Sequence, residues 1–200
     1  TQGRGILPTP VIGGVGVMQD VTACVDIALR EAGLALILVG ETKGHLGQSI
    51  YLRDILGRED GPPPPVDLSV EKRNGDFVRA QIDARRVAAC HDLSDGGLAL
   101  ALAEMAMAGN TGLTVALPND TACPAHAYMF GEDQGRYVMA VRPGDVDAVL
   151  KDAAAAGVPA TRLGTSGGAA LTVEGLLAIS VADLRRAHES WLPAYMEARS

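Results

Sequence analysis

The stretch VAACHDLSDGGLALALAEMA, residues 87–106, decides the fold class. Residues 87–90 are a short apolar run typical of a strand, and the HDLSDGG sequence at 91–97 is typical of a loop. Residues 98–108 are rich in Ala, Leu and Met and carry one charge, Glu104, which predicts a helix buried on most faces. A strand that leads into a buried helix predicts a layered α/β or α+β domain.

The rest of the chain extends this alternation. Further strands are predicted at residues 34–40, 113–117, 135–141, 160–163 and 169–173, with residues 165–168 as a hairpin turn between the last two. Further helices are predicted at residues 20–32 (where a strand stays open), 49–56, 67–86, 145–156 and 181–198, with a short one ending near residue 130. Pro193 should break or kink the last helix.

The composition argues against several classes of protein. The chain has 200 residues, enough for one domain with a sizeable core, and 17 Lys and Arg against 24 Asp and Glu give a net charge of −7. This acidic balance argues against a nucleic acid or an anionic membrane as a partner. No apolar run reaches the roughly 18 residues that a membrane span needs. We expect residues 1–19 to be a linker and residues 20–200 the domain, cut from a longer polypeptide, since the chain opens on Thr1.

The cysteines and histidines show no metal or disulfide pattern. Cys24, Cys90 and Cys123 are odd in number and widely spaced, which argues against a disulfide framework and a zinc site and favours reduced thiols in the cytoplasm. Cys90 and His91 would point to opposite faces of a strand, so they form a poor nucleophile–base pair.

The HDLSDGG loop is the first candidate site. Gly96 and Gly97 allow close backbone approach, and a helix start beside Ser94 favours an oxyanion such as phosphate. Asp92 and Asp95 have the carboxylates that bind Mg²⁺ next to a phosphate. The alternative is a turn in which Ser94 or Asp95 only caps the helix.

The FGEDQGR sequence at residues 130–136 is the second candidate. Glu132, Asp133, Gln134 and Arg136 are clustered just before a predicted core strand, and such clusters often converge on a ligand. The alternative is a surface turn in which Arg136 pairs with one of the two carboxylates at little energetic gain. The glycines at 13–16 and the GHLGQS loop at 44–49 match no nucleotide-binding motif, since the first lacks the GxGxxG spacing and the second a lysine.

Taken together, four segments resemble one family. They are ILPTPVIGGVGVMQD (6–20), HDLSDGGLALALAEMA (91–106), FGEDQGRYVMAV (130–141) and LLAISVADLRRAHESWLPAYM (176–196). The chain resembles the C-terminal domain of the second half of the small-type synthetase subunit in the phosphoribosylformylglycinamidine synthase family. This resemblance implies the fold of an aminoimidazole ribonucleotide (AIR) synthase-related C-terminal domain, with a mixed β-sheet packed with helices. Another member of the AIR synthase superfamily is the alternative.

The resemblance also implies an activity for the longer polypeptide. Such a ligase uses ATP and Mg²⁺ to convert formylglycinamide ribonucleotide to the amidine in cytoplasmic purine biosynthesis. A glutaminase subunit supplies the ammonia, a small third subunit often joins the complex, and the remaining domains of the synthetase are further partners. The family's catalytic histidine and ATP-binding lysine lie in other domains, so this chain is expected to carry no catalytic residue.

By internal duplication, the resemblance assigns metal binding to Asp92 and substrate binding to Glu132, Asp133 and Gln134. Asp133 departs from the family's serine and places a negative charge where a phosphorylated substrate would lie, which indicates a repurposed copy of the site. The leading hypothesis is a structural or auxiliary-nucleotide domain. A second ligand cleft and an interaction module are the alternatives, and a homodimer is expected for the chain alone.

Overall fold

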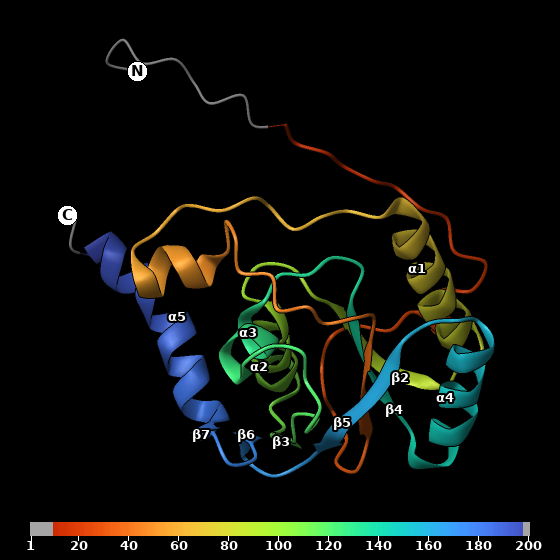
Figure 1. The fold of residues 1–200 in the computed structure, drawn as a ribbon. Coiled ribbons are helices and arrows are strands. Elements are labelled where there is room, and N and C mark those ends of the chain that lie inside the picture. Colours follow the sequence, from red (N-terminus) through yellow and green to blue (C-terminus); the bar gives the residue numbers. More distant parts are fainter. Residues whose placement is uncertain (1–9, 198–200) are drawn as a thin grey trace.

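The computed structural model describes residues 10–197 and contains one seven-stranded mixed sheet (Figure 1). The strand order is β2-β4-β1-β5-β3-β6-β7, and every neighbouring pair is antiparallel except β3 and β6, which are parallel. The strands are β1 (Ala35–Val39), β2 (Val87–Asp92), β3 (Leu113–Val115), β4 (Tyr137–Val141), β5 (Ala160–Ser166), β6 (Ala170–Val173) and β7 (Leu177–Ser180).

Helices cover both faces of this sheet. One face packs against α2 (Gly97–Gly109), α3 (Ala125–Phe130) and the start of α5 (Val181–Glu197), and the other against α1 (Leu68–Asp83) and α4 (Val146–Ala155) (Figure 1). The central strand β1 is buried along its whole length. Its residues alternate between the two hydrophobic cores, which explains why its sequence is apolar at every position. The predicted layered α/β architecture with a mixed sheet is confirmed.

Side-chain hydrogen bonds hold the starts of two predicted helices. The Asp67 carboxylate accepts from the backbone amides of Ser69 (2.9 Å) and Val70 (3.2 Å), so α1 begins directly after Asp67. The Ser49 hydroxyl accepts from the amide of Leu52 (3.2 Å) at the start of η2 (Tyr51–Ile55), a single helical turn of π type. Short 3-10 turns, η1 (Val21–Ala23) and η3 (Pro143–Asp145), complete the helical elements of the described residues.

The predicted helix at 20–32 is wrong. Only η1 is helical there, and the chain then runs without a helix beside β2, where the Asp26 carbonyl accepts from the Cys90 amide (3.0 Å). The buried Leu29 donates its amide to the Met105 carbonyl of α2 (3.2 Å). The segment therefore uses its backbone groups to cover the edge of β2 and the end of α2, and its β-branched residues suit this extended path.

The predicted hairpin at 165–168 is also wrong. β5 and β6 do not pair, because β3 lies between them: Leu113 pairs with Ser166 on one side and with Leu171 on the other. Gly112 lets β3 enter this position, since a Cβ there would lie 2.4 Å from the Ala170 carbonyl oxygen.

The C-terminal region differs from expectation at two points. β7, which the sequence analysis missed, is a short edge strand with three exposed residues and therefore lacks the apolar signature of a buried strand. α5 begins directly after Ser180, whose hydroxyl accepts from the Asp183 amide (3.0 Å), and it continues through Pro193 without the predicted break. No helix among residues 10–197 is long and apolar enough to cross a membrane.

Candidate functional site

Three loops meet at one end of the sheet because of its strand directions. Residues 40–50 follow β1, residues 93–96 follow β2, and residues 131–136 precede β4. β4 is antiparallel to both neighbours, and Tyr137, its first residue, pairs with the last residues of β1 and of β2. The topology thus brings together the two motifs that the sequence singled out. It adds residues 40–50, whose sequence matches no nucleotide-binding motif.

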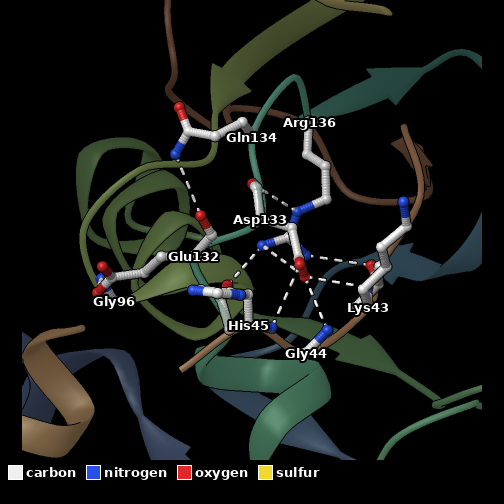
Figure 2. Close-up of polar contacts among 10 residues, drawn as sticks. Lys43, Gly44, His45, Gly96, Glu132, Asp133, Gln134 and Arg136 are labelled. Atoms are coloured by element: carbon white, nitrogen blue, oxygen red, sulfur yellow. Dashed lines mark hydrogen bonds and ion pairs between the residues drawn. The ribbon is translucent and has the colours of Figure 1, made fainter. Parts of the chain in front are cut away.

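The Asp133 carboxylate binds the first of these loops. Its Oδ2 accepts from the backbone amides of Lys43 (3.0 Å) and Gly44 (2.8 Å), and its Oδ1 accepts from the amide of His45 (3.2 Å). Figure 2 shows the carboxylate facing this row of amides, and Asp133 is only 7% exposed. Three successive amides form a concave donor set that favours an anion, and here the anion is the chain's own side chain.

Glu132 connects the other two loops. Its Oε1 accepts from the amide of Ile50 (2.9 Å) and from the amide of Gly96 (2.9 Å), and its own backbone amide donates to the His45 carbonyl (2.8 Å). In Figure 2 its side chain extends toward Gly96, away from Asp133. Glu132 therefore holds the start of η2 and the loop before α2 together.

Arg136 is the largest fully buried side chain of the described residues. Its Nε donates to the Asp133 carbonyl (3.0 Å), its Nη1 to the Thr42 hydroxyl (3.1 Å) and its Nη2 to the Gly131 carbonyl (2.5 Å). Its Nη2 lies 3.9 Å from the Asp133 carboxylate. Burial lowers the pKa of Arg136 below its ordinary value, and the nearby Asp133 carboxylate offsets part of this effect. The alternative of an exposed, weakly paired surface turn is wrong.

The glycines of the HDLSDGG loop let its backbone lie close to that of the neighbouring loop. Gly96 and Gly97 both have positive φ, and a Cβ on Gly97 would lie 2.3 Å from the Gly131 carbonyl oxygen. Gly96 is the N-cap of α2 and no side chain caps that helix, so the alternative in which Ser94 or Asp95 caps it is wrong. The side chains of Ser94 and Asp95 instead lie exposed to solvent.

The remaining candidates are exposed as well. Gln134 is exposed and donates to the Glu132 carbonyl (3.1 Å), and Asp92 is exposed at the end of β2 with its Oδ1 3.5 Å from Nδ1 of His91. His91 itself is bonded through Nε2 to Glu104 of α2 (2.8 Å), on the opposite side of β2 from Cys90. Within residues 10–197, no group of three or more His, Cys, Asp or Glu side chains is arranged to hold a metal ion.

Sequence reasoning missed the row of amide donors at residues 43–45, because backbone groups leave no side-chain signature. Gly44 was the available signal. It has positive φ, and a Cβ on it would lie 2.7 Å from the Cys123 sulfur, so the loop can occupy this place only with glycine there.

Residues 31–174 match the family described as "AIR synthase related protein, C-terminal domain". The chain belongs to this family. As an AIR synthase-related domain it is 57% identical over 200 residues to the phosphoribosylformylglycinamidine synthase subunit PurL of Parvibaculum lavamentivorans, covering 99% of this chain and 27% of that protein. It is 58% identical over 198 residues to PurL of Methylocella silvestris, with the same two coverages. The domain thus spans about a quarter of the length of these relatives.

Solved structures show the same fold. The AIR synthase-related domain superposes on T. maritima PurL complexed with FGAR with a TM-score of 0.70 at 19% identity, over 82% of this chain and 30% of that one. It superposes on the hydrogenase maturation protein HypE of E. coli with a TM-score of 0.56 at 20% identity, over 78% of this chain and 52% of that one. The predicted family and fold are confirmed.

Proposed function

We propose that this chain is a domain of a PurL polypeptide that uses ATP to convert formylglycinamide ribonucleotide to the amidine in purine biosynthesis. The observation that carries the proposal is the 57% identity to PurL over 99% of the chain. T. maritima PurL, which shares its fold, has been solved in complexes with ATP, with ADP and with FGAR, which supports a nucleotide and this substrate for the whole polypeptide.

Within that polypeptide, this domain acts as a framework and supplies no catalytic residue. Its support is that Glu132, Asp133 and Arg136 direct their hydrogen bonds to groups of the domain itself. A substrate contact through these side chains would have to break bonds that hold three loops together. Asp133 replaces the family's serine and adds a negative charge, and this charge stabilises the loop at residues 43–45 by accepting its amide hydrogen bonds.

A second role is favoured by the groups that stay exposed. Ser94, Asp95, Asp92 and Gln134 project from the loops at this end of the sheet, near the start of α2. Two carboxylates suit Mg²⁺, which keeps several waters and takes further oxygens from a phosphate. An auxiliary Mg²⁺–nucleotide or a substrate phosphate is the ligand that these four residues would accept.

The proposed partners are the remaining domains of the polypeptide, a glutaminase subunit and a small third subunit, in the cytoplasm. A structure of PurLQS from Thermotoga maritima also shares the fold of this chain, which supports an assembly of PurL with further components.

The experiment that tests the activity compares the full-length PurL polypeptide with the chain alone. With ammonia, Mg²⁺ and ATP, we expect ADP release by the full-length protein to depend on formylglycinamide ribonucleotide, and the chain alone to release none. Substrate-dependent ADP release by the chain alone would refute the framework role. A full-length protein that requires a different substrate would refute the activity.

Calorimetric titration of the full-length polypeptide with Mg-ADP tests the exposed residues. Asp95→Ala together with Ser94→Ala should remove one binding event if the auxiliary site exists, whereas the exposed Asp54→Ala should leave the titration unchanged. An unaltered isotherm for the double variant would exclude the auxiliary site.

A further inference from the structure

The segment PVIGGVGVM, residues 10–18, exposes a continuous set of aliphatic side chains. Val11, Ile12, Val15 and Val17 are each between 91% and 102% exposed. Residues 10–19 belong to no helix or strand, and no backbone hydrogen bond joins them to other described residues. Figure 1 shows the stretch (red) as an extended line that leads to the side of the domain where α1 lies. So many fully exposed aliphatic side chains in one segment mark a surface that another surface covers.

The structure fixes the point at which this segment joins the domain. Arg85, two residues after α1, has a φ of +60°, a conformation that costs a residue with a side chain about 1 kcal/mol or more. Its Nη2 donates to the Asp20 carboxylate (2.5 Å) and its Nη1 to the Thr22 carbonyl (2.5 Å). The position favours glycine, and these bonds explain why an arginine stands there: they hold residues 20–22 against the end of α1.

The segment also fails to pack on its own domain. Val17 and Met18 line one side of a cavity of about 790 Å³, whose other side is formed by Gly75, Val78 and Ile82 of α1. The base of the segment is anchored, a space beside it is unfilled, and its backbone donors and acceptors have no partner among residues 10–197. These are the features of a strand that pairs elsewhere.

We infer that residues 10–18 add as a β-strand to an apolar sheet edge in the part of the PurL polypeptide that lies outside this chain. The inference rests on the proposed function. Alignment with the Rhodopseudomonas palustris HaA2 relative covers 100% of this chain but 27% of that protein, so the relative carries this segment together with about three quarters of a polypeptide that can cover it. The segment contains no charged residue, which selects an apolar partner, and its Val and Ile residues favour a strand.

Hydrogen exchange measured by mass spectrometry tests this docking. In the full-length PurL polypeptide, the amides of residues 11–18 should exchange at least about tenfold more slowly than in the chain alone, because pairing removes them from solvent. Equal and fast exchange in both proteins would overturn the inference. Slow exchange in the chain alone that fades on dilution would overturn it too, since a second copy would then be the occupant.

A matched pair of substitutions gives an independent measure. Val15→Lys touches nothing within the domain, so the melting temperature of the chain alone should not change, whereas that of the full-length polypeptide should fall by about 3 °C or more. Val66→Lys, in an exposed loop, should change neither protein. No effect of Val15→Lys on the full-length polypeptide would contradict the docking. Because synthetase activity is measured separately, loss of the proposed function and loss of the proposed docking are distinguishable.

Discussion

Replacing Asp133 by alanine removes the acceptor for three backbone amides at once. The bonds to Lys43, Gly44 and His45 are 2.8–3.2 Å long and partly buried, so each contributes about 1 kcal/mol, near the middle of the range for hydrogen bonds in proteins. The buried Arg136 also loses its nearest carboxylate, at 3.9 Å. We therefore expect the free energy of unfolding to fall by about 3 kcal/mol, which corresponds to a melting temperature roughly 6–12 °C lower.

The assay is thermal unfolding of the chain followed by circular dichroism, confirmed by urea titration. Asp133→Asn keeps one acceptor oxygen, so it should lose about half as much stability. Asp54→Ala is the control, because this exposed carboxylate pairs with Arg53 at the surface and should contribute less than about 0.5 kcal/mol. If Asp133→Ala is as stable as Asp54→Ala, the proposed bracing role of Asp133 is refuted.

Three further outcomes are expected. Gly97→Ala should lower the melting temperature by several degrees, since the new methyl group has no room, whereas Gly144→Ala should be nearly neutral because nothing lies within 4 Å of its Cβ position. Hydrogen bonds from Arg86 and Gln81 hold the pKa of Asp152 below its ordinary value of 3.8, so the stability that it contributes is present above that pH and fades as the pH falls below it. Asp152→Asn should flatten the dependence of the melting temperature on pH in that acid range. Burial, with a smaller effect of Asp92, raises the pKa of Cys90 to about 12, so iodoacetamide at pH 8 should label the exposed Cys24 and spare Cys90 in the native chain, as mass spectrometry would show.

The sequence predicts the elements whose signal is local. The apolar run at 34–40, the helical pattern at 67–86 and the Ala- and Leu-rich run at 98–108 correspond to β1, α1 and α2. Prediction from the sequence fails where long-range contacts determine the local conformation. Residues 24–33 have apolar residues at helical spacing, yet they lie against β2 and α2 because a sheet edge there needs backbone partners.

The order of the strands in the sheet is a second feature that the sequence does not predict. Residues 160–173 contain two strands and a glycine turn, the usual signature of a hairpin, and only the long-range pairing of β3 separates β5 from β6. No local pattern records that insertion, apart from a glycine at 112 whose reason appears only in three dimensions.

The residues of the two motifs lie close together in the structure, and the sequence shows only part of what their side chains do. The sequence singles out Glu132, Asp133 and Arg136 and, as a separate candidate, the HDLSDGG loop; the structure brings the two together. The sequence does not show that the Asp133 and Glu132 carboxylates accept hydrogen bonds from backbone amides of residues 43–50. Nearly every residue type carries such an amide, so it leaves no sequence signal.

The central claim, that this domain is a framework and holds none of the catalytic groups, is tested most directly by one rate. Full-length PurL carrying Asp92→Ala together with Asp95→Ala loses both exposed carboxylates while every buried bond of the three loops stays in place. If the domain is a framework, kcat for substrate-dependent ADP release stays within about twofold of the unaltered protein, and a kcat reduced a hundredfold or more in a folded variant would contradict that role.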